Sequence, residues 1–311
     1  MIVYKFGGAS IKDTASIKNL YSIISSYKNK QHLIIVISAM GKTTNSLEKI
    51  ATLYFKNLDY HEELQKLTNY HTEIANQLDK TNTISKTILD IFDKLKKRLN
   101  SKPSNNFDYE YDRIIPFGEI LSTNIISLYL KLSGIDNKLL NAKNIIRTDS
   151  NYREANVNWT LTKHLLQKNI ASSNSKIFII QGFIGGNSKG YYTSLGREGS
   201  DYTAAIVAYC MNANEITVWK DVAGLYNADP KYFDNVVKID KISYQDIIEL
   251  SYYGASVIHS KTIKPLQNKN IPLYIKSFSN PQEEGTLITS PENINNKINI
   301  PCYILKQNQI I

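Results

Sequence analysis

Short apolar runs alternate with stretches of helical spacing along most of the chain. Residues 2–6 (IVYKF) and 32–40 (HLIIVISAM) are rich in β-branched residues and predict two strands. Residues 14–29, between these runs, have the spacing of a helix. Apolar residues within 47–54 recur at i, i+3, i+4 and i+7, which predicts a second helix. The chain therefore begins in the order strand, helix, strand, helix.

A long polar segment follows this start. From about residue 60 to residue 99 the chain has helical spacing and contains neither glycine nor proline. We expect one or two long surface helices here, and residues 101–108 (SKPSNNFD) end them. A further helix is predicted from about Gly118 to Leu132, because apolar residues recur on one of its faces.

The second half of the chain continues the alternation. Further strands are predicted at 176–183, 190–196, 215–222 and 272–278, and further helices at 243–254 and 261–270. Strands that alternate with helices favour an α/β fold, in which a mostly parallel sheet is covered by helices on both faces. The length of 311 residues suffices for one large or two medium domains.

The composition is that of a globular protein with a core, and it carries an excess of positive charge. Hydrophobic residues make up 42% of the chain, and the formal net charge is +9. Such a charge suits nucleic acid, a membrane surface or an anionic small substrate. The lysines are scattered and form no long basic run, so the charge is first explained by a compositional bias toward Lys and Asn, although the positive field would still favour a polyanionic ligand. We expect neither nucleic acid nor a membrane as a partner.

Other features of the sequence indicate the cellular compartment. The two cysteines, Cys210 and Cys302, lie far apart without nearby histidines, which argues against a disulfide framework or a zinc site. The N-terminus lacks the pattern of a signal peptide, and no apolar run reaches the ~18–20 residues of a membrane span. We therefore expect a cytoplasmic protein.

The glycines are clustered in turns after predicted strands, where backbone N–H groups can bind an anion. Eight of the 14 glycines lie within residues 7–8 and 182–199, after predicted strands. Glycine lets backbone N–H groups approach a ligand and form an anion cradle. In the second cluster Arg197 precedes Ser200 and Asp201, one of which is a reasonable N-cap of the next helix. A helix N-terminus beside an arginine is a good site for phosphate or carboxylate.

Three common phosphate-binding patterns are not found in this sequence. A P-loop needs a glycine five residues before Gly41, where this chain has Val36. No G-x-G-x-x-G fingerprint follows the first strand, which argues against a dinucleotide-binding domain. The protein-kinase motifs are also missing from the sequence.

Seven blocks of the chain resemble aspartate kinases, in the same order, from about residue 2 to residue 290. These blocks are KFGGAS, VISAMGKTTN, FGEILST, QGFIGG, TSLGREGSDYTAA, WKDVAGLYNADP and YYGASVIHSKT. The resemblance implies the amino-acid kinase fold, a three-layer α/β/α arrangement with an open, mainly parallel sheet. It also implies transfer of the γ-phosphoryl group of MgATP to the β-carboxylate of L-aspartate. The product, 4-phospho-L-aspartate, would lead to lysine, threonine and methionine.

The resemblance further implies a role for each matching residue. Lys5 would hold the transferring phosphoryl group, and Asp201 would organise this lysine. Arg197 would clamp the α-carboxylate of aspartate, and Glu119 would take its α-ammonium. The aspartate site as a whole would consist of Ser38, Thr44, Glu119, Arg197 and Ser200. ATP would contact Lys5, Phe6, Gly7, Gly8, Lys220, Asp221, Tyr226, Lys231 and Ser256. The protein is expected to supply no metal ligand of its own, because Mg²⁺ would arrive with ATP.

The sequence departs from the family pattern at three positions. Ala9 replaces a small hydroxyl residue, and Ser256 replaces a lysine that contacts phosphate. Lys220 stands where many relatives have threonine. Since the negative charge of the transferred group remains, we expect Lys220 to supply the missing cation, and Lys261 is the alternative.

The resemblance also sets expected boundaries. Residues 1–290 would form the catalytic domain, with aspartate bound by about 1–195 and ATP by about 196–290. Residues 291–311 would be a C-terminal stub with a strand-like apolar end, in place of the regulatory ACT domains that the family usually carries. We therefore expect no strong feedback inhibition by lysine or threonine. The chain could form a homodimer.

Two other functions remain open at this point. The chain could be an amino-acid kinase with a different acceptor, although Glu119 and Arg197 suit an α-amino acid. It could also be a protein that binds ligands on a kinase scaffold without catalysis, which the loss of lysine at Ser256 would favour. An assay of ADP release with L-aspartate, L-glutamate and UMP would separate these alternatives.

Overall fold

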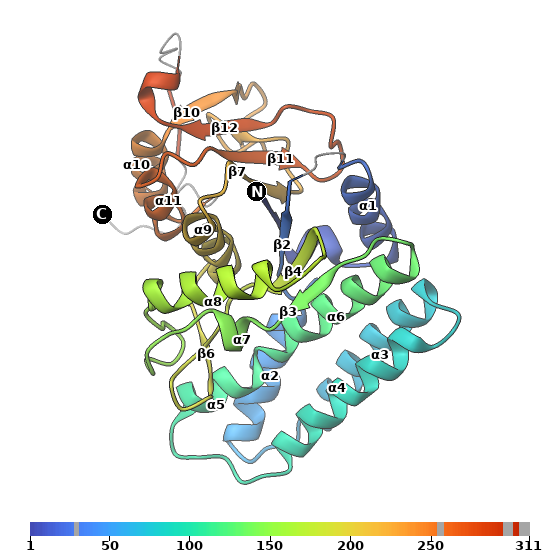
Figure 1. The fold of residues 1–311 in the computed structure, drawn as a ribbon. Coiled ribbons are helices and arrows are strands. Elements are labelled where there is room, and N and C mark those ends of the chain that lie inside the picture. Colours follow the sequence, from blue (N-terminus) through green and yellow to red (C-terminus); the bar gives the residue numbers. More distant parts are fainter. Residues whose placement is uncertain (28–30, 254–257, 295–300, 305–311) are drawn as a thin grey trace.

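A computed structural model describes residues 1–27, 31–253, 258–294 and 301–304. Within these residues, eight strands form one sheet in the order β10-β12-β11-β7-β1-β2-β4-β3 (Figure 1). The strands of this sheet are β1 (Ile2–Phe6), β2 (Leu33–Ile37), β3 (Lys138–Leu140), β4 (Ile177–Gln181), β7 (Glu215–Lys220), β10 (Lys241–Ser243), β11 (Leu273–Ser277) and β12 (Thr286–Thr289). Two small antiparallel pairs lie outside the sheet, namely β5 (Ile184–Gly186) with β6 (Tyr192–Ser194) and β8 (Leu225–Tyr226) with β9 (Lys238–Ile239).

The sheet is mainly parallel, as the alternation of strands and helices predicts. Strands β11, β7, β1, β2, β4 and β3 all run in the same direction. The direction reverses at β12, which pairs antiparallel with β11 and parallel with β10. The predicted fold is therefore confirmed, with a reversal near one edge of the sheet.

Alternation along the central strands sorts their side chains between two cores. In β2, Leu33, Ile35 and Ile37 belong to one core, whereas Ile34 and Val36 belong to the other. Because successive residues of a strand point to opposite faces, a sheet buried on both faces needs apolar residues at every position. Strand β1 follows the same rule, so Lys5 shares its face with Val3.

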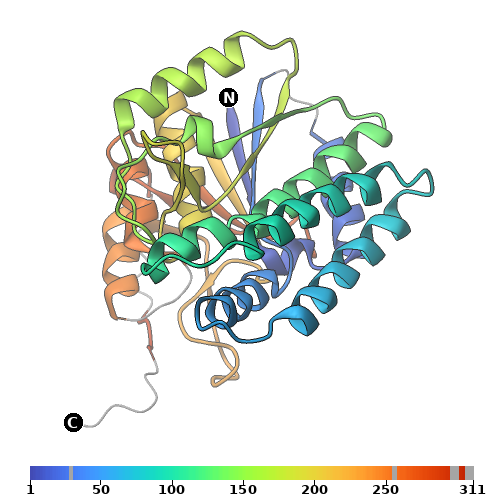
Figure 2. The same ribbon diagram turned by 90° about the horizontal axis from the view of Figure 1, so that it is seen from below.

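Helices cover both faces (Figures 1 and 2). The first core is formed with α1 (Thr14–Ser25), α2 (Thr43–Phe55), α3 (His61–Leu78), α4 (Thr83–Leu99), α5 (Phe107–Ile114) and α6 (Phe117–Leu132). The second core is formed with α7 (Ala142–Ile145), α8 (Trp159–Ala171), α9 (Gly199–Met211), α10 (Tyr244–Tyr253) and α11 (Ser260–Gln267). Short 3-10 helices span Gly8–Ile11 and Pro291–Asn293.

The structure refines several predicted elements. The segment from 60 to 99 forms two helices, α3 and α4, and their apolar faces join the first core through residues such as Ile88 and Phe92. The strand predicted at 190–196 is β6, which pairs with β5 outside the main sheet. Helices α5 and α8 were not expected from the apolar spacing.

The end of the chain differs from the expected strand. Residues 301–304 form no regular element and lie along the segment after β8. There the backbone N–H of Tyr303 donates to the carbonyl of Asn227 at 2.7 Å, and the Tyr303 ring stacks on Phe233. The remainder of this predicted strand lies outside the described residues. None of the helices described here is long and apolar enough to cross a membrane.

Candidate active site

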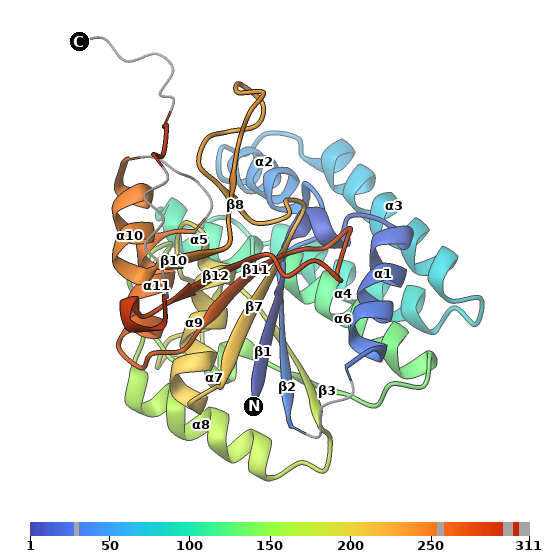
Figure 3. The same ribbon diagram turned by 90° about the horizontal axis from the view of Figure 1, so that it is seen from above.

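The carboxyl ends of β1, β2 and β7 lie together at one edge of the sheet. The three strands are parallel and in register, with Phe6 opposite both Ile37 and Trp219. Figure 3 shows these strands side by side, with the segment that carries β8 beyond their ends. Ligands of open α/β sheets bind beyond this edge. Three predicted residues, Lys5, Ser38 and Lys220, are carried here by β1, by the turn after β2 and by β7.

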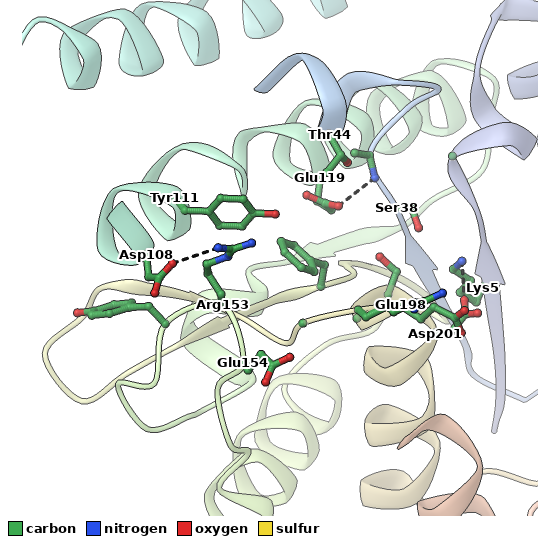
Figure 4. A pocket seen from close by; sticks show the side chains of 18 of the residues that line it. Lys5, Ser38, Thr44, Asp108, Tyr111, Glu119, Arg153, Glu154, Glu198 and Asp201 are labelled. Atoms are coloured by element: carbon green, nitrogen blue, oxygen red, sulfur yellow. Dashed lines mark hydrogen bonds and ion pairs between the residues drawn. The ribbon is translucent and has the colours of Figure 1, made fainter. Parts of the chain in front are cut away.

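A cavity of about 900 Å³ opens at this edge (Figure 4). It is lined by nine of the predicted site residues, which come from positions far apart in the sequence. They are Lys5, Gly8, Ser38, Thr44, Glu119, Arg197, Ser200, Asp201 and Lys220.

A buried carboxylate connects two lysines in the cavity. The Nζ of Lys5 lies 2.5 Å from Oδ1 of Asp201, and the Nζ of Lys220 lies 3.6 Å from Oδ2. Burial by itself would raise the pKa of the Asp201 carboxyl, but the two ammonium groups hold this pKa below its usual value. Asp201 is therefore ionised at neutral pH and fixes both lysines.

Asp201 and Ser200 do not cap α9, contrary to the sequence prediction. The helix begins at Gly199, and its N-cap is Glu198, which makes no side-chain capping bond. Asp201 sits in the first turn and uses its carboxylate for the ion pairs. This placement follows from the face of β1 on which Lys5 lies, since that face packs against α9.

Glu119 is a second buried carboxyl group. It belongs to the first turn of α6, is 3% exposed, and accepts a hydrogen bond from the N–H of Ala39 to Oε1 at 3.2 Å. Its Oε2 has no hydrogen-bond partner among the described residues. Burial raises the pKa of Glu119 to about 8. A cation that enters the cavity would satisfy Oε2 and bring this pKa down.

The two glycines after Lys5 have different surroundings. A Cβ on Gly8 would lie 2.7 Å from the carbonyl oxygen of Ala39, so only glycine fits where the turns after β1 and β2 meet. The carbonyl of Gly8 also accepts a hydrogen bond from the N–H of Gly41 at 3.0 Å. At Gly7 the nearest atom to such a Cβ would be the Nζ of Lys5, at 3.5 Å. The backbone of Gly7 therefore passes close to the lysine ammonium.

Arg197 lies on the turn that leads into α9, and its side chain is exposed at the rim of the cavity. No ion pair joins its guanidinium to any residue that the structure describes. A free anion can therefore reach it from the cavity side.

Among the described residues, the other predicted nucleotide contacts do not line this cavity. The Phe6 side chain is buried and stacks on Trp219, with ring centroids 6.0 Å apart. Three residues, Asp221, Tyr226 and Lys231, belong to the segment after β7. Ser256 lies outside the described residues. The roles of these residues remain predictions.

Several lining residues were missed by sequence reasoning. They are Asp108, Tyr111, Asn151, Tyr152, Arg153, Glu154, Phe183 and Glu198. Most of them come from α5 and from the loop before α8, where no spacing marks them. Arg153, Phe183 and Glu198 all have positive φ angles, of 69°, 65° and 52°. Left-handed backbone at non-glycine residues is uncommon and tends to gather at functional sites.

The described part of the chain offers no cluster of three or more His, Cys, Asp or Glu side chains that could hold a metal ion. Instead, the cavity presents lysine ammonium groups and the backbone of a glycine turn. Such a site suits an anionic ligand that brings its own cation.

Known proteins resemble this chain over nearly all of its length. The profile of the Amino acid kinase family matches residues 1–277. A bifunctional aspartokinase/homoserine dehydrogenase of Buchnera aphidicola is 34% identical over 93% of this chain and 36% of its own length. A crystal structure of Escherichia coli aspartokinase III in complex with aspartate and ADP has a TM-score of 0.86 and 28% identity, over 93% of this chain and 64% of that one.

A crystal structure of aspartate kinase from Clostridium acetobutylicum has a TM-score of 0.81 and 28% identity, over 96% of this chain and 65% of that one. The present chain thus spans less than two thirds of the length of each of these three relatives. The family profile, by contrast, covers most of the chain. This protein therefore belongs to the amino acid kinase family.

Proposed function

We propose that the chain carries the activity of an ATP-dependent aspartate kinase. It would transfer the γ-phosphoryl group of ATP to the β-carboxylate of L-aspartate and release 4-phospho-L-aspartate and ADP. The observation that carries this proposal is Glu119, whose buried Oε2 has no partner in the described part of the chain and shares a cavity with Arg197 and Lys5. An amino-acid substrate needs one anion for its ammonium and cations for its carboxylates, and the three side chains supply these.

Substrate binding would follow from these charges. Glu119 would accept the α-ammonium of aspartate, and Arg197 would bind the α-carboxylate. Ser38 and Thr44 would donate hydrogen bonds nearby, and Ser200 would lie beside them. The β-carboxylate would then point toward Lys5, where the γ-phosphoryl group is held.

The chemistry needs charge neutralisation more than proton transfer. One oxygen of the β-carboxylate attacks the γ-phosphorus, and the bond from phosphorus to the bridging oxygen of ADP breaks. The nucleophile is already ionised, so no general base is required. Lys5, fixed by Asp201, would neutralise the transferring group, with Lys220 as a second cation and Gly7 and Gly8 as backbone donors. Mg²⁺ bound to ATP would neutralise further phosphate charge.

We also propose that different parts of the chain bind the two substrates. Residues up to about 195 would mainly bind aspartate, and residues from about 196 to 290 would mainly bind ATP, with contacts from Asp221, Tyr226 and Lys231. Arg197 and Ser200 on the aspartate side, and the glycine turn after Lys5 on the ATP side, are exceptions to this division. The product would supply the synthesis of lysine, threonine and methionine.

Trapping of the product tests the proposal directly. ADP release is coupled to a spectrophotometric readout with L-aspartate, L-glutamate or UMP as acceptor. Hydroxylamine converts an acyl phosphate to a hydroxamate, so a hydroxamate that forms only with ATP and L-aspartate is the expected result. The Lys5→Ala variant serves as the control for contaminating kinases. Release of ADP with another acceptor, or binding of both substrates without turnover, would contradict the proposal.

A further inference from the structure

Arg153 enters the cavity from a backbone conformation that arginine rarely adopts. Its φ angle is 69°, in the left-handed region that favours glycine and asparagine. The residue lies on the loop before α8, and it lines the same cavity as Glu119 and Lys5. An arginine held in this conformation at a cavity wall raises the question of what its guanidinium binds.

The surrounding structure imposes this conformation. The backbone N–H of Arg153 donates to Oδ2 of Asp112 at 2.9 Å. Asp112 is fully buried, and it also accepts hydrogen bonds from the N–H and the hydroxyl of Ser194 on β6, at 2.9 and 2.5 Å. These hydrogen bonds join the loop to α5 and β6 at this residue. They therefore fix the backbone position from which the Arg153 side chain extends.

Two weaker contacts hold the guanidinium in place. It lies over the ring of Tyr111, 4.5 Å from the centroid, and the hydroxyl of Tyr111 donates to Glu48 at 2.7 Å. Its Nη1 lies 3.2 Å from Oδ1 of Asp108, but the side chains of this pair are 47% and 54% exposed. An ion pair so open to water contributes little to stability, so another anion can replace Asp108 at small cost. The ring leaves the donor edge of the guanidinium available to such an anion.

The position of Arg153 determines which charged group of a bound substrate its guanidinium could contact. Figure 4 shows Arg153 and Lys5 on opposite sides of the cavity, with Glu119 between them in this view. If the β-carboxylate of aspartate faces Lys5 and the ammonium faces Glu119, the α-carboxylate is the group directed away from Lys5.

We propose that Arg153 is a specificity-determining residue that binds the α-carboxylate of the acidic substrate together with Arg197, in exchange for Asp108. This inference rests on the proposed aspartate kinase function and adds a second cation to its substrate site. In the absence of substrate, the ion pair with Asp108 would hold the guanidinium beside the site.

The test compares substrates with and without an α-carboxylate. Arg153→Gly removes the guanidinium, suits the positive φ angle and keeps the N–H that Asp112 binds. It should raise the KM for L-aspartate at least about tenfold with little change in kcat, as expected for loss of a charged hydrogen-bonding partner. With L-aspartic acid α-amide, in which a neutral amide replaces the α-carboxylate, the same variant should change KM less than about twofold.

Two further variants separate binding from a structural role. Asp108→Asn removes the competing anion and should lower the KM for L-aspartate. Arg113→Ala removes an arginine of α5 that lies over Tyr109 in a similar way but does not line the cavity, and it should leave KM unchanged. If Asp108→Asn raises KM as Arg153→Gly does, the pair is a structural latch and the proposal is wrong. An equal loss with aspartate and its α-amide would also overturn it, whereas turnover of aspartate by the unmodified protein tests the proposed function separately.

Discussion

If aspartate binds at Glu119 as proposed, the burial of this carboxyl group leads us to expect that binding releases a proton. With its pKa raised to about 8 by burial, Glu119 is mostly protonated at pH 7. An α-ammonium group binds the carboxylate form, so aspartate must displace the proton before it can be held. The perturbation is a change of pH between 6 and 9, carried out on the unmodified protein and on Glu119→Gln.

The pKa sets the size of the effect. From a pKa of about 8, roughly one tenth of the protein has ionised Glu119 at pH 7, and half has it at pH 8. The affinity for aspartate should therefore rise about fivefold between pH 7 and pH 8. Below pH 7 it should fall about tenfold per pH unit, which is ~1.4 kcal/mol of binding free energy. Above pH 9 the affinity should no longer depend on this group.

Calorimetry measures the proton directly. Titration of aspartate at pH 7 in two buffers of different ionisation enthalpy should report release of about 0.9 proton per aspartate bound. Glu119→Gln keeps the shape of the side chain but cannot ionise, so it should bind aspartate weakly, release no proton and show a flat pH profile. ADP binding by the same proteins is the control. Aspartate binding that releases no proton from the unmodified protein would refute the reasoning.

The remaining predictions concern the stability of the protein and the positively charged side chains of the candidate site. The Glu119 pKa is raised on folding, so its contribution to stability is fully present below about pH 4.5 and is lost as the pH rises toward about 8; chemical denaturation should show Glu119→Gln gaining stability over the unmodified protein across this range. Lys5→Ala should depress kcat far more than the KM for aspartate, because the charge it meets develops during transfer; normal turnover would contradict its assignment. Arg197→Ala should weaken aspartate binding while nucleotide binding, followed by calorimetry, persists; the loss should be about 2–5 kcal/mol when bound aspartate shields the exposed guanidinium from water. Lys220→Ala should lower kcat at least tenfold, or ~1.4 kcal/mol of barrier, since its ammonium lies 3.6 Å from Asp201 inside the cavity; unchanged ATP kinetics would rule out its role as the second cation.

Much of the fold could be predicted from local sequence patterns. The runs that became β1, β2 and β4 are apolar at nearly every position, because each strand is covered on both faces. In β7 and β11 the aliphatic residues alternate with other types, and these aliphatic side chains belong to the second core. The same patterns did not reveal α5 or α8, and they could not show that β6 pairs outside the main sheet. Those outcomes depend on contacts between segments far apart in the chain.

For the candidate site, the sequence by itself determined which charged groups were available and on which strand ends and turns they stood. The glycine turn after the first strand, and Arg197 within the second glycine cluster, indicated an anion site without any structure. Only the tertiary structure decided that Asp201 pairs with two lysines rather than capping α9, and that Arg153 faces the cavity. The same holds for the burial of Glu119, one oxygen of which finds no partner among the residues that the structure describes. The physical reason is that charge is a property of the residue, whereas desolvation and ion pairing depend on which distant segments pack around it.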